Sequence, residues 1–190
     1  MKKFKQLIYI FLVVIVGSYI GGNYNTLKVQ ENQIDRTLAE IQNNLQSRFD
    51  TFSSFAETAK FSAELESEVF TQIAQFRSGI DSADSTNELV SALNQANTGF
   101  RGLLATFENY PEIRSTNQFE NFQTEISGME NRLRIARKDF NDASTEFNNM
   151  IDVFPRNYVA FIFGFKNVDL FEAEEQATER PNLTEILNEN

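Results

Sequence analysis

The polar residues between positions 130 and 148 are the best candidates for chemistry in this sequence. Glu130 and Arg137 are seven residues apart, and so are Arg134, Asn141 and Asn148. Seven residues are about two turns of an α-helix, so these side chains lie in rows along one side of it. Carboxylate, guanidinium and amide groups in such rows form hydrogen bonds with one another and with neighbouring helices.

Two interpretations of these polar rows are open. In the first, which we favour, the five residues fix the register between packed helices, as buried amides do in coiled coils. In the second, they hold a ligand, and its polar contacts are Arg134, Arg137, Asn141 and Asn148.

The residue types that the chain lacks argue against catalysis. It contains no histidine, no cysteine and no tryptophan. Histidine is the commonest general base near neutral pH, and typical zinc sites need cysteine or histidine. A di-metal carboxylate bundle would need Glu-x-x-His pairs, and no glycine-rich phosphate loop occurs. We therefore expect a protein that is not an enzyme, with no catalytic residue, no metal site and no cofactor.

The charge balance excludes a further class of partner. The chain has 27 acidic and 17 basic residues, which gives a formal net charge of −10 at pH 7. An acidic surface repels phosphate backbones and anionic lipid headgroups. We therefore expect no nucleic acid partner and no peripheral electrostatic binding to a membrane.

Residues 1–22 are predicted to be a membrane anchor. Lysines precede an uncharged apolar run from Leu7 to Ile20. Residues 7–22 would be about 24 Å long as a helix, slightly short for a bilayer span. A cleaved signal peptide is the alternative, but no Ala-x-Ala pattern appears, so we favour an uncleaved anchor. The leading lysines predict a single-pass cell-membrane protein with a cytoplasmic N-terminus and an extracytoplasmic C-terminal domain.

The elements that position the polar rows are predicted to be helices. Large apolar side chains from Phe119 to Phe154 recur at alternating steps of three and four residues, which places them on one buried helical stripe. Similar stripes precede it, and capping patterns at Ser85–Glu88 and Ser115–Gln118 mark helix starts. We predict an all-α fold, an antiparallel up-and-down bundle of four helices near residues 26–49, 52–80, 86–109 and 116–153.

The stretch from residue 26 to residue 80 allows two interpretations. Arg48, Ser62 and Glu66 interrupt its apolar stripe, so we expect the helix seam to be weakest in the middle of the stretch. Asp50, Ser53 and Ser54 are helix-capping types, which favours a turn near Asp50. One continuous helix over the whole stretch is the alternative, but it would outrun its neighbours.

The predicted bundle domain comprises residues 23–171. Within it, residues 156–171 form an apolar patch that is too short to span a membrane and should fold back on the bundle or lie at the membrane face. Residues 172–190 are rich in glutamate and are expected to be an acidic, flexible tail.

Several short runs of residues go beyond the helical pattern. They include Glu-Asn-Tyr-Pro-Glu-Ile at 108–113, Glu-Asn-Arg at 130–132 and Ala-Arg-Lys-Asp-Phe-Asn at 136–141. With the apolar N-terminal segment, they resemble the LemA family of bacterial membrane-anchored helical proteins over residues 104–172 and 7–49. The resemblance implies a long-helix antiparallel bundle outside the cytoplasmic face, with no established enzymatic activity. The family's Leu-Ile-Pro-Asn-Leu segment is not matched, because the corresponding positions near Thr51 lack the proline.

These observations lead to one expected function and one alternative. We expect a membrane-anchored, non-catalytic scaffold that contacts the membrane through residues 7–22 and presents its helical surface to protein partners of the cell envelope. Association with further copies of the chain is compatible with such a surface. The alternative is a ligand-binding or sensing bundle.

Overall fold

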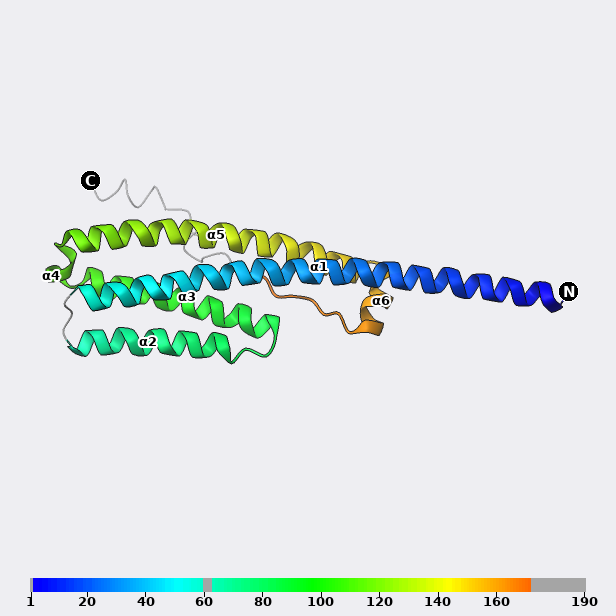
Figure 1. Ribbon diagram of the computed structural model, residues 1–190, viewed down its shortest axis with the longest axis horizontal. Helices are drawn as coiled ribbons and strands as arrows, with labels where there is room; N and C mark the ends of the chain where they lie inside the picture. Colours follow the sequence, from blue (N-terminus) through cyan, green and yellow to red (C-terminus); the bar gives the residue numbers. More distant parts are fainter. Residues whose placement is uncertain (1, 60–62, 172–190) are drawn as a thin grey trace, which may run out of the picture.

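The computed structural model describes residues 2–59 and 63–171, in which every regular element is a helix (Figure 1). The all-α class predicted from the sequence is confirmed for this part of the chain. The predicted acidic tail, residues 172–190, lies outside the described residues. The helices are α1 (Lys2–Thr58), α2 (Ala63–Asp81), α3 (Thr86–Glu108), α4 (Pro111–Arg114), α5 (Asn117–Asp152) and α6 (Arg156–Phe163).

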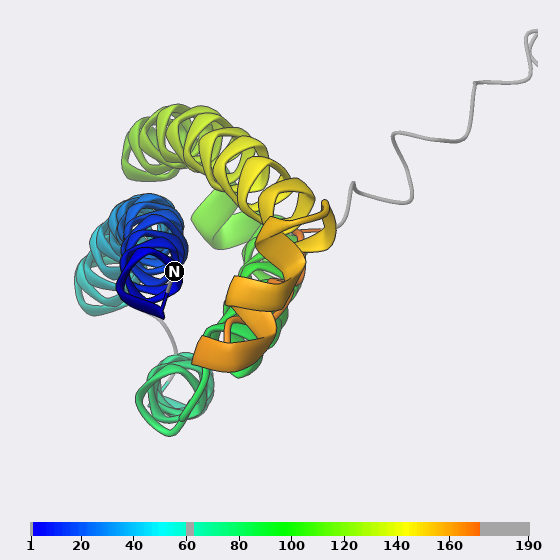
Figure 2. The same ribbon diagram turned by 90° about the vertical axis from the view of Figure 1, so that its right-hand side faces the viewer.

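The long helices α1, α2, α3 and α5 lie lengthwise beside one another, and their directions alternate along the chain (Figures 1 and 2). α1 packs along α5, and α2 packs against α3. The short helix α6 lies crosswise to α1 near the point where α1 leaves the bundle (Figures 1 and 2). Polar side chains of α1, α3 and α5 can therefore meet in the interior of the bundle.

α1 continues without a break through the region where the sequence predicts a turn. It extends to Thr58, and the buried Phe52 and Phe55 carry its apolar stripe past Asp50. Asp50 lies within the helix, and its carboxylate accepts a hydrogen bond from Arg77 of α2 at 3.0 Å. The predicted turn near Asp50 is therefore wrong, because the stripe continues and neither glycine nor proline interrupts it. The alternative of one helix to residue 80 is also wrong, since α2 is a separate helix.

The centre of the core is a group of phenylalanine rings from three helices. The ring centroid of Phe52 on α1 lies 4.8 Å from that of Phe100 on α3 and 5.0 Å from that of Phe122 on α5. Phe55 stacks on Phe122 with 4.1 Å between centroids. Burial of each ring stabilises the fold by about 1.5–3 kcal/mol, and each ring pair adds about 0.5–1.5 kcal/mol. We call these four residues the phenylalanine cluster.

The predicted stripe of α5 is buried over the first part of the helix and shifted by one residue at some positions of the last part. The predicted positions from Phe119 to Phe140 are buried, and so is Phe147. Beyond Phe140, Ser144 and Ile151 are buried in place of the predicted Ala143 and Met150, which are only partly buried, and the predicted Phe154 is exposed. A straight helix drifts by about 20° per heptad from a strict seven-residue repeat. The drift accounts for the one-residue shift.

Side-chain caps mark the starts of α3 and α5. The Ser85 hydroxyl accepts a hydrogen bond from the backbone N–H of Glu88 at 3.3 Å, as predicted. The cap of α5 is Thr116, whose hydroxyl accepts from the backbone N–H of Phe119 at 3.2 Å. The prediction of Ser115 as this cap is wrong by one residue, because Ser115 closes the short helix α4.

After α6 the chain returns in an extended conformation to the bundle. Residues 165–171, which we call the strap, run back from α6 toward the bundle as far as the buried Phe171 (Figure 1). Hydrogen bonds to α5 place the strap beside that helix. The predicted return of this segment to the bundle is confirmed for the strap.

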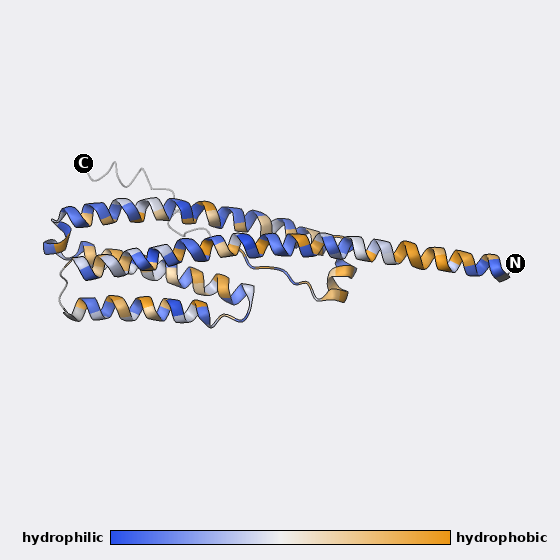
Figure 3. Cartoon of the chain, in the orientation of Figure 1, coloured by the Kyte–Doolittle hydropathy of each residue, from blue (hydrophilic) through white to orange (hydrophobic). Residues whose placement is uncertain are grey.

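The N-terminal part of α1 projects beyond the bundle and is strongly apolar (Figures 1 and 3). An 18-residue window of the helix has a mean hydropathy of 1.8, and none of it is buried. Among the residues that the structure describes, α1 is the one helix that is long and apolar enough to cross a membrane.

Candidate functional site

Arg48 of α1 is a charged residue in the interior of the bundle. Its side chain is 1% exposed. Its Nη1 donates to Oδ1 of Asn97 on α3 at 3.0 Å, and its Nη2 donates to Oε1 of Glu130 on α5 at 3.0 Å. The guanidinium lies over the ring of Phe100, 4.9 Å from its centroid. We call Arg48, Asn97 and Glu130 the arginine cluster; it links three helices through one side chain.

The environment of Arg48 opposes its charge, and its partners compensate only in part, because its buried Nε has no hydrogen-bond partner among the described residues. Burial lowers the pKa of the Arg48 guanidinium, and the nearby Glu130 carboxylate acts in the opposite direction. The Glu130 side chain is 45% exposed, so water reaches the carboxylate side of the ion pair. Removing Glu130 or Asn97 would leave a buried cation short of partners, which costs more than the pair itself contributes.

Sequence reasoning found only one member of the arginine cluster, Glu130. Arg48 lies seven residues from both Ile41 and Phe55, so it occupies a position of the apolar stripe. A charge at a stripe position was the available signal, but we interpreted it as a weak point of the seam. The partners are 49 and 82 residues away in the sequence, and no local pattern identifies them.

Arg134 lies apart from the other predicted site residues. It is on the exposed face of α5, where its Nη2 donates to Oδ1 of Asn131 at 2.6 Å. The position directly follows the buried Leu133, and its side chain is exposed. Arg134 is therefore bonded within α5, whereas Glu130 is bonded to Arg48 of α1.

Arg137 is a cation with few partners. Its guanidinium lies 5.1 Å from the centroid of the Phe171 ring. Its Nε and Nη2 atoms are buried and have no hydrogen-bond partner among the described residues. Burial, followed by the charges of Arg101 and Arg48, lowers the pKa of Arg137 to about 10. The group is therefore charged at neutral pH and can accept an additional anionic or carbonyl partner.

Asn141 and Asn148 hold the backbone of the strap. Nδ2 of Asn148 donates to the carbonyl of Val168 at 2.8 Å, and Oδ1 accepts from the Val168 N–H at 2.9 Å. Asn141 forms the same pair of bonds with Phe171, at 2.9 Å and 2.8 Å. Each amide thus replaces a peptide group of a neighbouring strand.

The spacing of the two asparagines matches that of the strap. Seven residues of an α-helix cover about 10.5 Å, and the three residues from Val168 to Phe171 cover about 10 Å when extended. A third side-chain amide also binds the backbone of the strap: Oδ1 of Asn87 accepts from the backbone N–H of Asp169 at 3.0 Å. The favoured interpretation, register between helices, does not describe Asn141 and Asn148, because their partners are backbone groups of an extended segment.

Replacing both Asn141 and Asn148 by alanine is expected to release the strap and to lower the free energy of unfolding by about 2 kcal/mol, since four hydrogen bonds are lost. Hydrogen exchange provides the measurement: the N–H groups of Val168 and Phe171 should lose protection. Asn149→Ala, on the exposed side of α5, is the matched control and should leave them protected. A lower melting temperature with full protection of the strap would contradict this assignment.

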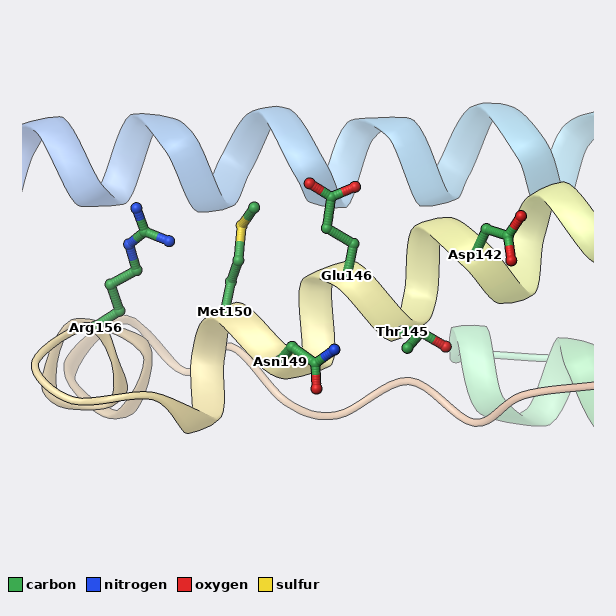
Figure 4. A pocket seen from close by; sticks show the side chains of 6 residues that line it. All are labelled: Asp142, Thr145, Glu146, Asn149, Met150 and Arg156. Atoms are coloured by element: carbon green, nitrogen blue, oxygen red, sulfur yellow. The ribbon is translucent and has the colours of Figure 1, made fainter.

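An open groove of about 440 Å³ lies between α1 and the C-terminal part of α5 (Figure 4). Glu146 and Arg156 point across it toward α1 and are already engaged there, with Gln30 at 3.1 Å and Asn23 at 3.0 Å. In the described part of the chain, no group of three or more His, Cys, Asp or Glu residues is arranged to hold a metal ion. The groove therefore offers a polar surface without a recognisable set of catalytic groups.

Comparison with known proteins gives a consistent result. The model of the LemA family matches residues 37–184, which include the arginine cluster and the strap. Magnetosome proteins MamQ 1 and MamQ 2 of Paramagnetospirillum magneticum are each 28% identical over 192 residues, covering 86% of this chain and 70% of those proteins. Protein LemA of Metamycoplasma hominis is 25% identical over 189 residues, covering 98% of this chain and 86% of that protein.

Proposed function

Because the chain belongs to the LemA family, we propose that it is a membrane-anchored, non-catalytic scaffold. In this proposal, residues 7–22 cross a membrane once, with the N-terminus in the cytoplasm, and the following helices form an antiparallel four-helix bundle outside it. The bundle presents its helical surface to protein partners of the cell envelope.

The observation that carries the proposal is the change of burial along α1. The large apolar side chains between Phe4 and Tyr19 are exposed, whereas the core stripe of the same helix begins at Leu27. Exposed apolar surface is unfavourable in water by about 25 cal/mol per Å² and is stabilised in hydrocarbon. Because the helix has no break between the two parts, a crossing by residues 7–22 would hold the bundle directly at the membrane surface.

The composition and the contacts support a non-catalytic role. The chain has no histidine or cysteine to act as base, nucleophile or metal ligand. The buried Arg48 joins helices, and the partly buried Asn141 and Asn148 hold the strap. These side chains therefore stabilise the positions of the helices and the strap. A scaffold needs such a fixed surface to bind its protein partners.

Cross-linking in cells, followed by purification of the full chain from membranes, tests the proposal. We expect the chain in the membrane fraction, cross-linked to other envelope proteins that mass spectrometry identifies. The absence of any cross-linked protein, together with a small molecule retained by the purified chain, would reject the scaffold in favour of ligand binding.

Arg137 favours ligand binding as the second candidate function. A buried guanidinium with two unpaired nitrogen atoms is costly to keep. An anionic ligand bound to these nitrogen atoms would offset that cost, with the Arg137 guanidinium as its contact.

Replacing Arg137 by glutamine is expected to leave the free energy of unfolding unchanged or to raise it by about 1 kcal/mol, because an under-partnered buried charge is removed. Thermal unfolding of the purified full chain in detergent measures this effect, with the exposed neighbour Lys138→Gln as control. If Arg137→Gln instead lowers the free energy of unfolding by more than about 2 kcal/mol, Arg137 has a structural role. Native mass spectrometry adds a functional readout: an anion that the unmodified chain retains and the Arg137→Gln variant loses would support ligand binding.

A further inference from the structure

We propose that α6 and the turn before it are a second membrane contact, which lies in the headgroup region of the same bilayer that α1 crosses. We call residues 153–163 the foot, and its partner is a lipid surface. The inference rests on the proposed crossing by α1.

The outward side of the foot is apolar and aromatic instead of polar. The buried Val159 and Ala160 pack against the bundle. In contrast, Phe161 is 86% exposed and Phe154 is 73% exposed. The other large exposed side chains of the foot are Val153, Tyr158, Ile162 and Phe163. A surface helix of a water-soluble domain carries polar residues on this side, so these side chains indicate an apolar environment.

The foot lies at the level where α1 passes from exposed apolar residues to the core. The rings of Phe163 and Tyr24 are 4.7 Å apart between centroids. Nε of Arg156, the first residue of α6, donates to Oδ1 of Asn23 at 3.0 Å. Asn23 directly follows the predicted membrane segment, so the foot is attached to α1 at the edge of that segment.

The direction of α6 fits the plane of a membrane. α6 lies crosswise to α1, and its surface has the same apolar character as the projecting end of α1 (Figures 1 to 3). If α1 crosses the bilayer along its normal, α6 lies parallel to the surface, which is the arrangement of interfacial helices. Tyrosine side chains are favoured at that depth, and Tyr24 and Tyr158 are both located there.

The charge of the foot also fits a lipid surface. The chain has a net charge of −10, yet the one charged residue of the foot is the cationic Arg156, and the next charged residue along the chain, Lys166 of the strap, is also cationic. Anionic headgroups attract such residues by about 1 kcal/mol each. Positive charge is attracted to an acidic protein surface as well as to anionic lipid. What favours lipid over a second copy is the position of the foot beside Asn23 and Tyr24, at the edge of the predicted membrane segment.

Single tryptophan residues can test this contact, because the chain has no tryptophan of its own. The full chain would be reconstituted in vesicles of phosphatidylcholine and phosphatidylglycerol as three variants. Phe161→Trp reports on the foot, Val13→Trp on the exposed part of α1, and Ile135→Trp on an exposed apolar position of α5 about 25 Å from the end of that helix. Unchanged circular dichroism of each variant shows that the fold is intact.

We expect the emission maximum of Phe161→Trp to lie at a shorter wavelength than that of the water-exposed Ile135→Trp. We also expect its emission to be quenched by lipids brominated near the headgroup. Val13→Trp should be quenched by lipids brominated near the bilayer centre, and Ile135→Trp only by acrylamide in water. Lipid quenching of Val13→Trp without lipid quenching of Phe161→Trp would reject the lipid contact of the foot and would still support the membrane crossing by α1. Failure of Val13→Trp to be quenched by lipid rejects the anchor itself. Protection of Phe161→Trp from acrylamide without quenching by lipid assigns the foot to a protein contact and also overturns the inference.

Discussion

Replacing Arg48 by alanine is expected to lower the free energy of unfolding by about 2–4 kcal/mol. The change removes hydrogen bonds to α3 and α5, leaves the buried amide of Asn97 without its partner, and opens a cavity beside Phe100. The exposed side of Glu130 limits the cost, because water can solvate its carboxylate. Urea unfolding of the full chain in detergent, followed by circular dichroism, measures the change.

Two further variants separate the charge of Arg48 from its packing. Arg48→Met keeps most of the volume and should recover part of the loss, because only the polar contacts are then missing. Arg77→Ala removes the exposed ion pair with Asp50 and is expected to cost at most about 1 kcal/mol. If Arg48→Ala and Arg77→Ala lower the free energy of unfolding by the same amount, the arginine cluster does not join the three helices as its contacts indicate.

Replacing Phe52 by alanine is the second change with a large expected effect, a loss of about 3–5 kcal/mol. The ring is fully buried and lies between Phe100 and Phe122, so its removal leaves a cavity where α1, α3 and α5 meet. The melting temperature of the full chain in detergent should fall clearly.

Phe161→Ala is the matched control for Phe52→Ala, because it removes the same ring from a position that is 86% exposed. The melting temperature should change little with this variant, since no core contact is lost. If both variants lower the melting temperature by the same amount, the phenylalanine cluster is not the centre of the core.

The helices could be predicted from the sequence where a local pattern decides the structure. The stripe from Phe119 to Phe140 and the cap at Ser85 depend on spacings of three or four residues, and both are found as predicted. The turn predicted near Asp50 failed for a physical reason: capping residue types are compatible with a helix interior when the apolar stripe continues on both sides. Phe52 and Phe55 gain more from burial in the phenylalanine cluster than a turn at Asp50 could contribute.

The candidate site could be predicted only in part, because its partners are distant in the sequence. Glu130, Arg137, Asn141 and Asn148 were identified from their spacing, but the partner of Glu130 is Arg48 on another helix. The two asparagines bind backbone groups, which carry no side-chain signal in a sequence. Heptad spacing predicts that such amides share one side of a helix; it does not distinguish a neighbouring helix from an extended strap.

The central proposal is that α1 anchors the bundle outside the cytoplasm. Because the chain has no cysteine, single substitutions on either side of the anchor can be labelled with a membrane-impermeant maleimide in spheroplasts. We expect Ser91→Cys, at an exposed position of α3, to be labelled before the membrane is opened, and Lys5→Cys to be labelled only afterwards. Labelling of Ser91→Cys only after the membrane is opened would contradict the proposed topology.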